Sequence, residues 1–221
     1  AQLKIVDLNG KETNIGKPAI YRAFDYSPDK QYILIRRVVK PYSYTSPAGS
    51  FNSITEIITK RGEPVDRKFP NGKYARNRPT GQDATVNGPR SYAWRTDQPA
   101  TLYWVTANDG GDPSKQASIR DILYTLSAPF TGEAEKIYEC KYRFTGIIWG
   151  KSDLALLSQR WRANRIASRV IINPDKKTAI EEDEGNDEQI NAVGGTYILA
   201  ANKFGREVLL IDSTKNASFL Y

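Results

Sequence analysis

The stretch from Gly88 to Pro113, GPRSYAWRTDQPATLYWVTANDGGDP, decides the fold. Its first part ends in the aromatic run Tyr92-Ala93-Trp94, and residues 95–99 then bring polar residues and a proline. Residues 101–105 are β-branched or aromatic with one leucine, which is the composition of a strand. The stretch therefore predicts a β-hairpin in which a polar turn joins two strands.

The same pattern recurs on both sides of this hairpin, in residues 24–35 and 147–157. In each copy an aromatic residue precedes an aspartate by three or four positions, as in Tyr26 and Asp29, Trp94 and Asp97, and Trp149 and Asp153. An apolar run follows each aspartate. We expect these aspartates to cap the backbone of their own turns, because short carboxylates commonly do so.

Each copy extends into a unit of four short strands, and self-similarity at about 50 to 70 residues is typical of a β-propeller, in which every copy is one radial blade. We expect blades at about 20–70, 88–142 and 143–180 and a partial blade at 194–221. In the first blade, residues 63–69 are expected to form the fourth, outer strand. The predicted fold is therefore all-β: a single propeller domain or propeller segment over residues 1–221, with about three to four blades of four antiparallel strands.

Composition agrees with a packed all-β body. Apolar residues make up 39% of the 221 residues and aromatic residues 11%, too much apolar surface for a disordered chain. The apolar runs are short and interrupted by Gly, Pro, Asn and Asp, which disfavours helices. We expect the four tryptophans, at positions 94, 104, 149 and 161, to pack between blades.

A formal net charge of +7 raises the question of nucleic acid binding. The basic residues are scattered rather than clustered beside exposed aromatics, so no nucleic acid partner is expected. The densest basic stretch, residues 67–78, is expected to be a solvated loop. The acidic stretch 181–188 does not meet the calcium-loop pattern, and we expect it to be a flexible surface excursion.

The residue types needed for several kinds of catalysis are missing. The chain has no histidine, which excludes a Ser-His-Asp triad or a Cys-His pair within it, and no G-x-S-x-G sequence occurs. No motif for a metal, nucleotide or other cofactor is present, and Cys140 is expected to be a buried structural thiol. No apolar run is long enough to span a membrane. The chain by itself is therefore expected to carry no catalytic residue, metal or cofactor.

Several motifs resemble one family. The turn Ser27-Pro28-Asp29-Lys30 is similar to the Ser-Pro-Asp-Gly turn of TolB-type and prolyl-oligopeptidase-type blades. Six further motifs follow in the order seen in the glutamyl-endopeptidase-like branch of the prolyl oligopeptidase family: PYSY at 41–44, GPRSYAW at 88–94, DGGDP at 109–113, RD at 120–121, APF at 128–130 and WG at 149–150. The resemblance covers about residues 20–173 and lies within that family's N-terminal propeller.

The resemblance implies a serine peptidase whose hydrolase domain, with its Ser-Asp-His triad, would follow this segment, so no catalytic residue is carried over. The propeller would restrict entry to peptides and position them, in a periplasmic or otherwise extracytoplasmic protein. Family propellers have seven or eight blades, so open blade faces here would favour self-association. The alternative is a free-standing scaffold of TolB or WD-repeat type that binds a protein partner.

If the peptide carries an acidic side chain, arginines near the central opening are its natural partners, because a guanidinium binds a carboxylate bidentately. The candidates lie on or beside second strands or within the family-like motifs: Arg36, Arg37, Arg90, Arg120, Arg160 and Arg162. The expected pocket rims are the PYSY and DGGDP loops, with Tyr42, Tyr44, Asp109 and Asp112.

Overall fold

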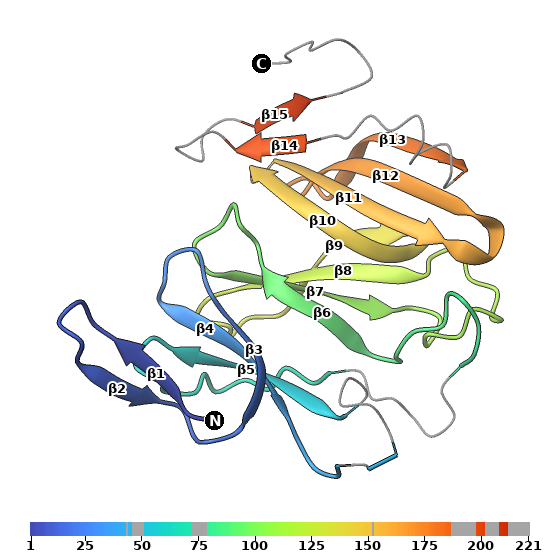
Figure 1. Ribbon diagram of the computed structural model, residues 1–221. Coiled ribbons are helices and arrows are strands. Elements are labelled where there is room, and N and C mark those ends of the chain that lie inside the picture. The colour runs from blue at the N-terminus through green and yellow to red at the C-terminus, as the bar shows by residue number, and fades with distance from the viewer. Residues whose placement is uncertain are drawn as a thin grey trace.

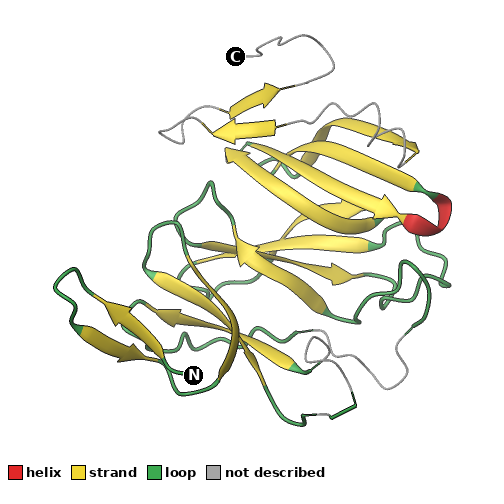
Figure 2. Cartoon of the chain, viewed as in Figure 1, coloured by secondary structure: helices red, strands yellow, loops and turns green. Residues whose placement is uncertain are grey.

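The computed structural model describes residues 1–42, 44–45, 51–71, 79–151, 153–186, 198–201 and 208–211. Over these residues the chain is built from antiparallel sheets, and one short 3₁₀ turn, η2 (Arg162–Asn164), is its only described helical element (Figure 2). Three meander sheets follow one another along the chain and stack face to face (Figure 1). This arrangement of successive blade-like sheets is a partial β-propeller, as the sequence predicts.

The first sheet contains β3 (Ile20–Tyr26), β4 (Tyr32–Val38) and β5 (Ser53–Thr59), hydrogen-bonded in that order. The expected fourth strand at 63–69 is reduced to two isolated bridges, Ile58 with Pro64 and Thr55 with Phe69. Pro64 has no amide to donate, and the amide of Arg67 bonds back to the carbonyl of Val65 at 2.8 Å, so the chain turns away from the ladder between the bridges. The first blade therefore has three strands and an irregular outer edge.

The second sheet has the four strands expected of it, β6 (Pro89–Trp94), β7 (Thr101–Ala107), β8 (Asp121–Ser127) and β9 (Glu135–Cys140), in sequence order. The hairpin predicted within residues 88–113 consists of β6 and β7, and its turn occupies residues 95–100. The predicted polar turn between two strands is therefore confirmed.

The third sheet contains β10 (Arg143–Lys151), β11 (Leu154–Trp161), β12 (Ile166–Asn173) and β13 (Thr178–Asn186). The described part of the acidic stretch is not a surface excursion as expected, because it forms most of the outer strand β13. An edge strand tolerates carboxylates, since one side of it faces water. Two carboxylates also find partners: Glu182 accepts a hydrogen bond from Ser168 at 3.0 Å, and Glu184 pairs with Lys141 at 2.8 Å.

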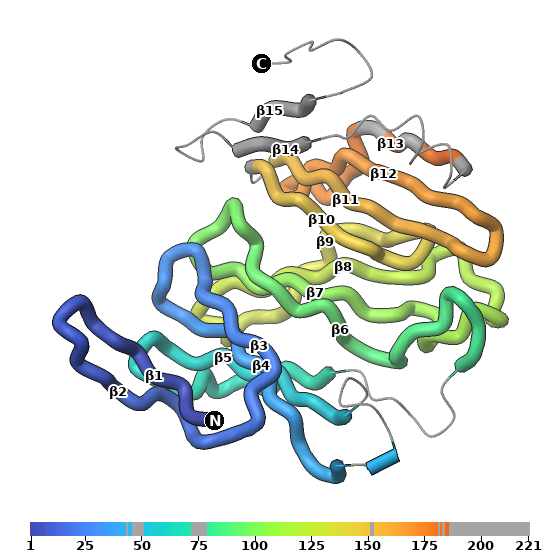
Figure 3. The backbone as a smooth tube through the Cα atoms, viewed as in Figure 1, coloured from blue at the N-terminus to red at the C-terminus, as the bar shows by residue number. Residues whose placement is uncertain are grey.

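Two hairpins flank the three sheets. At the N-terminal end, β1 (Leu3–Val6) and β2 (Glu12–Ile15) turn at Asn9-Gly10, where Gly10 takes a φ of +80°, a conformation that suits a tight hairpin. At the other end, β14 (Ile198–Ala201) pairs with β15 (Val208–Ile211), as also expected. The tube in Figure 3 shows the first hairpin and then the three sheets in the order of the sequence.

The core lies between the blades. Leu34 and Ile57 of the first blade pack with a group from the second blade that includes Trp94, Trp104 and Phe130. On the far side of the second sheet, Val105, Leu123 and Cys140 pack against Trp149, Leu157 and Val170 of the third blade. The remaining face of the first blade is covered by the β1–β2 hairpin, where Ile15 packs on Ile33, Ile35 and Ile58. The tryptophans are thus packed between blades, as expected.

Candidate functional site

A buried cluster of arginines and aspartates joins the second and third blades, beside the loop between β7 and β8. Arg143, the first residue of β10, lies at its centre, and its guanidinium is 8% exposed. It donates to Asp109 at 2.7 Å and to Asp121 at 3.1 Å, and also to the backbone carbonyls of Asp83 at 2.8 Å and Arg120 at 3.1 Å. One side chain therefore holds two carboxylates and two loops of the neighbouring blade.

Both carboxylates of the cluster are fully buried and have several donors. Asp121 also accepts from Arg90 and from the amide of Phe144 at 2.8 Å. Asp109 also accepts from Arg120 at 3.0 Å and from the amide of Gly111 at 2.9 Å. Burial acts to raise the pKa of Asp109, but the hydrogen bonds from Arg143 and Arg120 outweigh it and hold that pKa below its ordinary value.

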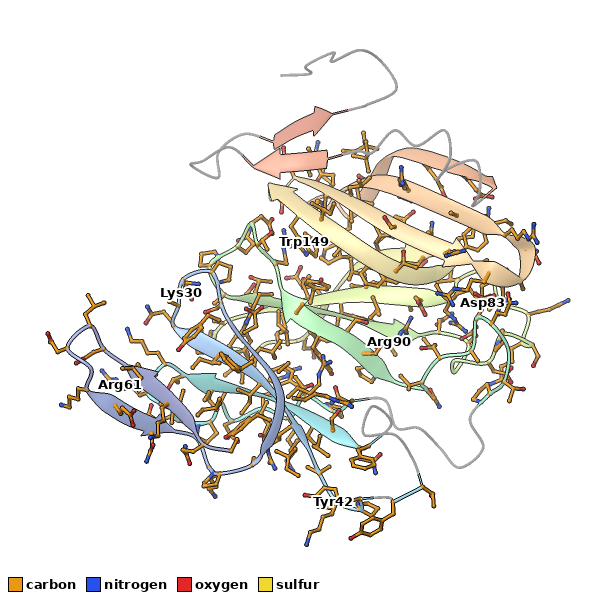
Figure 4. All side chains as sticks on the ribbon, viewed as in Figure 1. Lys30, Tyr42, Arg61, Asp83, Arg90 and Trp149 are labelled. Carbon is orange, nitrogen blue, oxygen red and sulfur yellow. The ribbon has the colours of Figure 1, made fainter. Side chains whose placement is uncertain are left out.

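The cluster extends to the loop between β11 and β12. Trp161 packs its ring against two guanidinium groups, with Arg120 4.2 Å and Arg143 5.7 Å from the ring centre. Asp83, from the segment before β6, accepts from the amides of Arg162 and Ala163 at 2.9 Å each and so caps the η2 turn of the third blade. Figure 4 shows Asp83 and Arg90 on the same side of the stack. The loops of two blades are thereby fixed to each other.

Backbone conformation and close packing explain why the DGGDP motif contains two glycines. Gly110 and Gly111 have φ values of +71° and +80°, a region in which glycine is favoured. A Cβ on Gly111 would lie 2.3 Å from the carbonyl oxygen of Thr85, whose amide donates to the Gly111 carbonyl at 3.1 Å. The motif therefore lets the β7–β8 loop pack closely on the segment before β6.

The aspartates of the repeated turns, Asp29, Asp97 and Asp153, have different partners in the three blades. Asp29 caps its turn as expected, accepting from the amide of Gln31 at 3.0 Å. Asp97 instead binds the side chain of Arg95 at 3.1 and 2.7 Å, and the Arg95 guanidinium lies 4.3 Å from the ring centre of Trp149 in the next blade. Asp153 is exposed. The sequence repeat thus marks the turn but not the role of its carboxylate.

The structure divides the predicted site residues into two groups. Arg90, Arg120 and Asp109 belong to the buried cluster, so their charges are already matched inside the protein. Arg37 is matched too, since it forms a bidentate pair with Glu56 at 2.6 and 2.9 Å. Arg160 lies half-buried on β11 and has a further interaction within the fold.

The other predicted residues remain available to solvent. Tyr42 is 47% exposed, and Tyr44 is fully exposed, both in the loop between β4 and β5. Asp112 is half-buried and accepts hydrogen bonds from the hydroxyl and the amide of Ser114, which lower the Asp112 pKa. Arg162 is exposed at η2, and Arg36 lies half-buried on β4; neither side chain has an ion pair with another described residue.

These residues lie in or next to equivalent connections. The loops β4–β5, β7–β8 and β11–β12 each join the second and third strands of their sheet, and the last two are held together by the Arg143 cluster. Sequence reasoning found the loops but did not find Arg143 or Asp83. Only their positions in the sequence could have indicated them, since Arg143 begins the third blade and Asp83 precedes the second.

Cys140, the last residue of β9, lies opposite Asp121 of the cluster in the second sheet. Burial raises the pKa of the Cys140 thiol, which is fully buried and therefore unsuited to act as a nucleophile. Within the described ranges there is no group of three or more side chains suited to a metal ion. No described helix is long and apolar enough to cross a membrane. The fold and this site define a rigid stack of propeller blades that presents loops.

Comparison with known proteins identifies relatives of this chain. It is 34% identical over 217 residues to a probable chloroplastic glutamyl endopeptidase of Oryza sativa subsp. japonica, covering 92% of this chain and 23% of that protein. The corresponding protein of Arabidopsis thaliana is 33% identical over 231 residues, covering 96% of this chain and 24% of that protein. The chain is thus homologous to part of proteins named glutamyl endopeptidase and spans about a quarter of their length.

Two other comparisons were made. No family model matches the chain. Among solved structures, the β-propeller domain of the Trilobed protease from Pyrococcus furiosus has a TM-score of 0.45 and 12% identity, covering 76% of this chain and 43% of that one. A structure of the eukaryotic initiation factor has the same TM-score of 0.45 and 10% identity, covering 84% and 40%. The propeller assignment rests on the sheet topology described above.

Proposed function

We propose that this chain is the non-catalytic propeller portion of a serine peptidase of the prolyl oligopeptidase family, and that it gates and positions peptides over a hydrolase domain outside these residues. The observation that carries the proposal is the identity of 34% and 33% to two proteins named glutamyl endopeptidase, across more than nine-tenths of this chain. The chain contains no histidine, so in this proposal the triad lies in another part of the polypeptide.

A gate has to keep its shape while its loops contact substrate. The ion cluster around Arg143 and the stacking of Arg95 on Trp149 join the second and third blades at two separate places. The indole of Trp94 also donates to the carbonyl of Asp25 at 3.1 Å and so joins the first two blades. Loops on such a scaffold are the usual carriers of binding residues. Tyr44, with its fully exposed ring, is the residue we assign to peptide contact.

Two arginines remain as partners for an acidic side chain. The guanidinium groups of Arg36 and Arg162 form no ion pair with a described residue. In contrast, Arg37, Arg90 and Arg120 each form an ion pair with a carboxylate of the protein. A free guanidinium binds a carboxylate without first breaking an internal pair. We therefore propose Arg36 and Arg162 as the substrate-facing members of the sequence-predicted set.

The test uses the full-length polypeptide that contains this chain. Cleavage of a short peptide with a glutamate is compared with cleavage of a folded protein, before and after removal of the propeller. Gating predicts that the intact protein prefers the short peptide and that removal reduces this preference. An unchanged preference would overturn the gating role. In the intact protein, Arg36→Gln or Arg162→Gln should raise KM for the glutamate peptide more than for its glutamine analogue, with Lys17→Gln as the control.

The alternative is a free-standing scaffold that binds a protein partner. The two functions differ in one observable: a peptidase has a reactive serine, and a scaffold has none. Labelling of the native polypeptide by a fluorophosphonate probe supports the peptidase, and failure to label supports the scaffold. The extracytoplasmic location stays a prediction, for which fractionation of the native source is the measurement.

A further inference from the structure

The sequence contains a single Asp–Pro peptide bond, between Asp112 and Pro113 in the β7–β8 loop. Such a bond is weaker in acid than other peptide bonds for two reasons. The proline nitrogen belongs to a tertiary amide, and once protonated it leaves readily as a secondary amine. The aspartate carboxylate is a nucleophile that can attack the carbonyl carbon of its own residue and close a cyclic anhydride. The proposed gate uses this loop as a rim but does not involve the bond.

A β-turn follows Asp112 and places a donor on the carbonyl of this bond. The amide of Lys115 donates to the carbonyl oxygen of Asp112 at 3.3 Å, with Pro113 and Ser114 at the two central positions of the turn. Attack on that carbonyl moves negative charge onto its oxygen. A backbone amide that already donates to the oxygen stabilises this charge as it develops. The turn therefore supplies one oxyanion donor at the Asp112–Pro113 bond.

The carboxylate of Asp112 is oriented by the same turn. Its Oδ1 accepts from the amide of Ser114 at 3.0 Å and from the hydroxyl of Ser114 at 2.7 Å, so the side chain is directed along the chain past Pro113. Among the described residues, none donates a hydrogen bond to Oδ2. The donors of Ser114 lower the pKa of Asp112, and the charges of Lys115 and Arg143 act in the same direction. The carboxylate thus stays ionised in mild acid, where protons are available for the leaving nitrogen.

Both sides of the bond are attached to the fold. On one side, the amide of Asp112 donates to the carbonyl of Asp109 at 3.5 Å, and the Asp109 side chain belongs to the buried cluster. On the other side, the guanidinium of Arg120 donates to the carbonyl of Lys115 at 2.6 Å. Strands β7 and β8, which flank the loop, pair along their whole length. A cut before Pro113 therefore opens the loop without releasing either part of the chain.

We propose that the chain cuts itself between Asp112 and Pro113 in mildly acidic solution. A carboxylate oxygen of Asp112 bonds to the carbonyl carbon of the same residue, and the C–N bond to Pro113 breaks as the nitrogen takes a proton from the solvent. Water then opens the cyclic anhydride at Asp112 and returns a proton to the solvent. The products are residues 1–112, which end in the free carboxyl groups of Asp112, and residues 113–221, which begin with the secondary amine of Pro113.

The test is incubation of the purified chain at about pH 4.5, above the ordinary aspartate pKa, with tryptophan fluorescence used to check that the chain stays folded. Mass spectrometry after denaturation should find two products whose masses add up to that of the chain plus one water. The folded chain should be cut roughly tenfold faster than the same chain in urea at the same pH, because only the folded chain holds the Lys115 amide on the carbonyl.

Variants separate the role of the carboxylate from that of the turn. Asp112→Asn keeps an acceptor for Ser114 but has no carboxylate, so it should stay intact. Asp175→Asn is the matched control, since that aspartate is also in an exposed turn but is not followed by proline, and it should be cut like the wild type. Ser114→Ala removes one of the two donors that orient the carboxylate and should be cut several times more slowly.

Three results would overturn the proposal. The first is a folded chain that stays intact. The second is an equal rate in the folded and the unfolded chain, which would make the cut a property of the dipeptide and not of the fold. The third is equal cutting of Asp112→Asn and Asp175→Asn, which would indicate a contaminating acid protease. Because none of these measurements uses peptidase activity or a peptide ligand, their failure leaves the proposed gate untouched.

Discussion

Replacing Arg143 by methionine should separate the second and third blades at one end. Methionine has a similar length but no charge, so Asp109 loses one of its two guanidinium donors and Asp121 loses another. The carbonyls of Asp83 and Arg120 also lose a donor. Removing one partner of a buried ion pair typically costs about 3–5 kcal/mol, because the remaining charge stays buried without compensation.

The assay is equilibrium unfolding in urea, followed by fluorescence of the inter-blade tryptophans. With a denaturant slope of about 2–3 kcal/mol per molar, the expected loss moves the midpoint down by roughly 1–2 M. Arg143→Lys keeps the charge but loses the planar fork, so it should fall between wild type and Arg143→Met. Arg162→Met is the matched control, since that side chain is exposed. A loss below about 1 kcal/mol for Arg143→Met would refute the reasoning, because surface pairs already contribute that much.

Three further predictions follow from the same contacts. Gly111→Ala should lower the urea midpoint, because the added Cβ would clash with the Thr85 carbonyl and the φ of this residue is positive. Gly132→Ala is the control and should be neutral, because its added Cβ meets nothing within 4 Å. Equal midpoints for the two variants would contradict this prediction. The pKa of Asp109 is lower in the folded protein than its unfolded value of about 3.9, so its contribution to stability is fully present above that value and is lost as the pH falls through the folded pKa. The free energy of unfolding should therefore decrease in acid, and decrease less in Asp109→Asn. A free energy of unfolding that stays constant below pH 4 would contradict the role of the cluster. Cys140 should react with iodoacetamide only after unfolding, and rapid alkylation of the folded chain would show that the thiol is not buried.

The sequence predicted the blades because their strands and turns are local features. The aromatic and β-branched runs on either side of residues 95–99 predicted the hairpin that β6 and β7 form. The missing outer strand of the first blade follows from a proline in the ladder, a signal that was readable. The acidic strand β13 could not be predicted from charge alone, because its carboxylates have partners far away in the sequence, Ser168 on β12 and Lys141 in the turn between β9 and β10.

The candidate site was less predictable, because an arginine in a sequence does not show whether its charge is already matched. Arg36 and Arg37 are neighbours on one strand, yet Arg37 binds Glu56 and Arg36 does not bind a described carboxylate. Asp109 and Asp112 stand in one short motif, yet Asp109 is buried with two arginines and Asp112 is exposed in its own turn. The first difference arises from pairing between two strands of one blade and the second from packing between blades, and sequence spacing encodes neither.

The central claim is that this chain is part of a larger serine peptidase, and the intact mass of the native polypeptide that carries it tests this most directly. We expect a mass several times the 24.8 kDa of this chain, since the chain spans about a quarter of the length of its relatives. A mass near 24.8 kDa would mean that the polypeptide has no hydrolase domain, and it would contradict the peptidase assignment in favour of a binding scaffold.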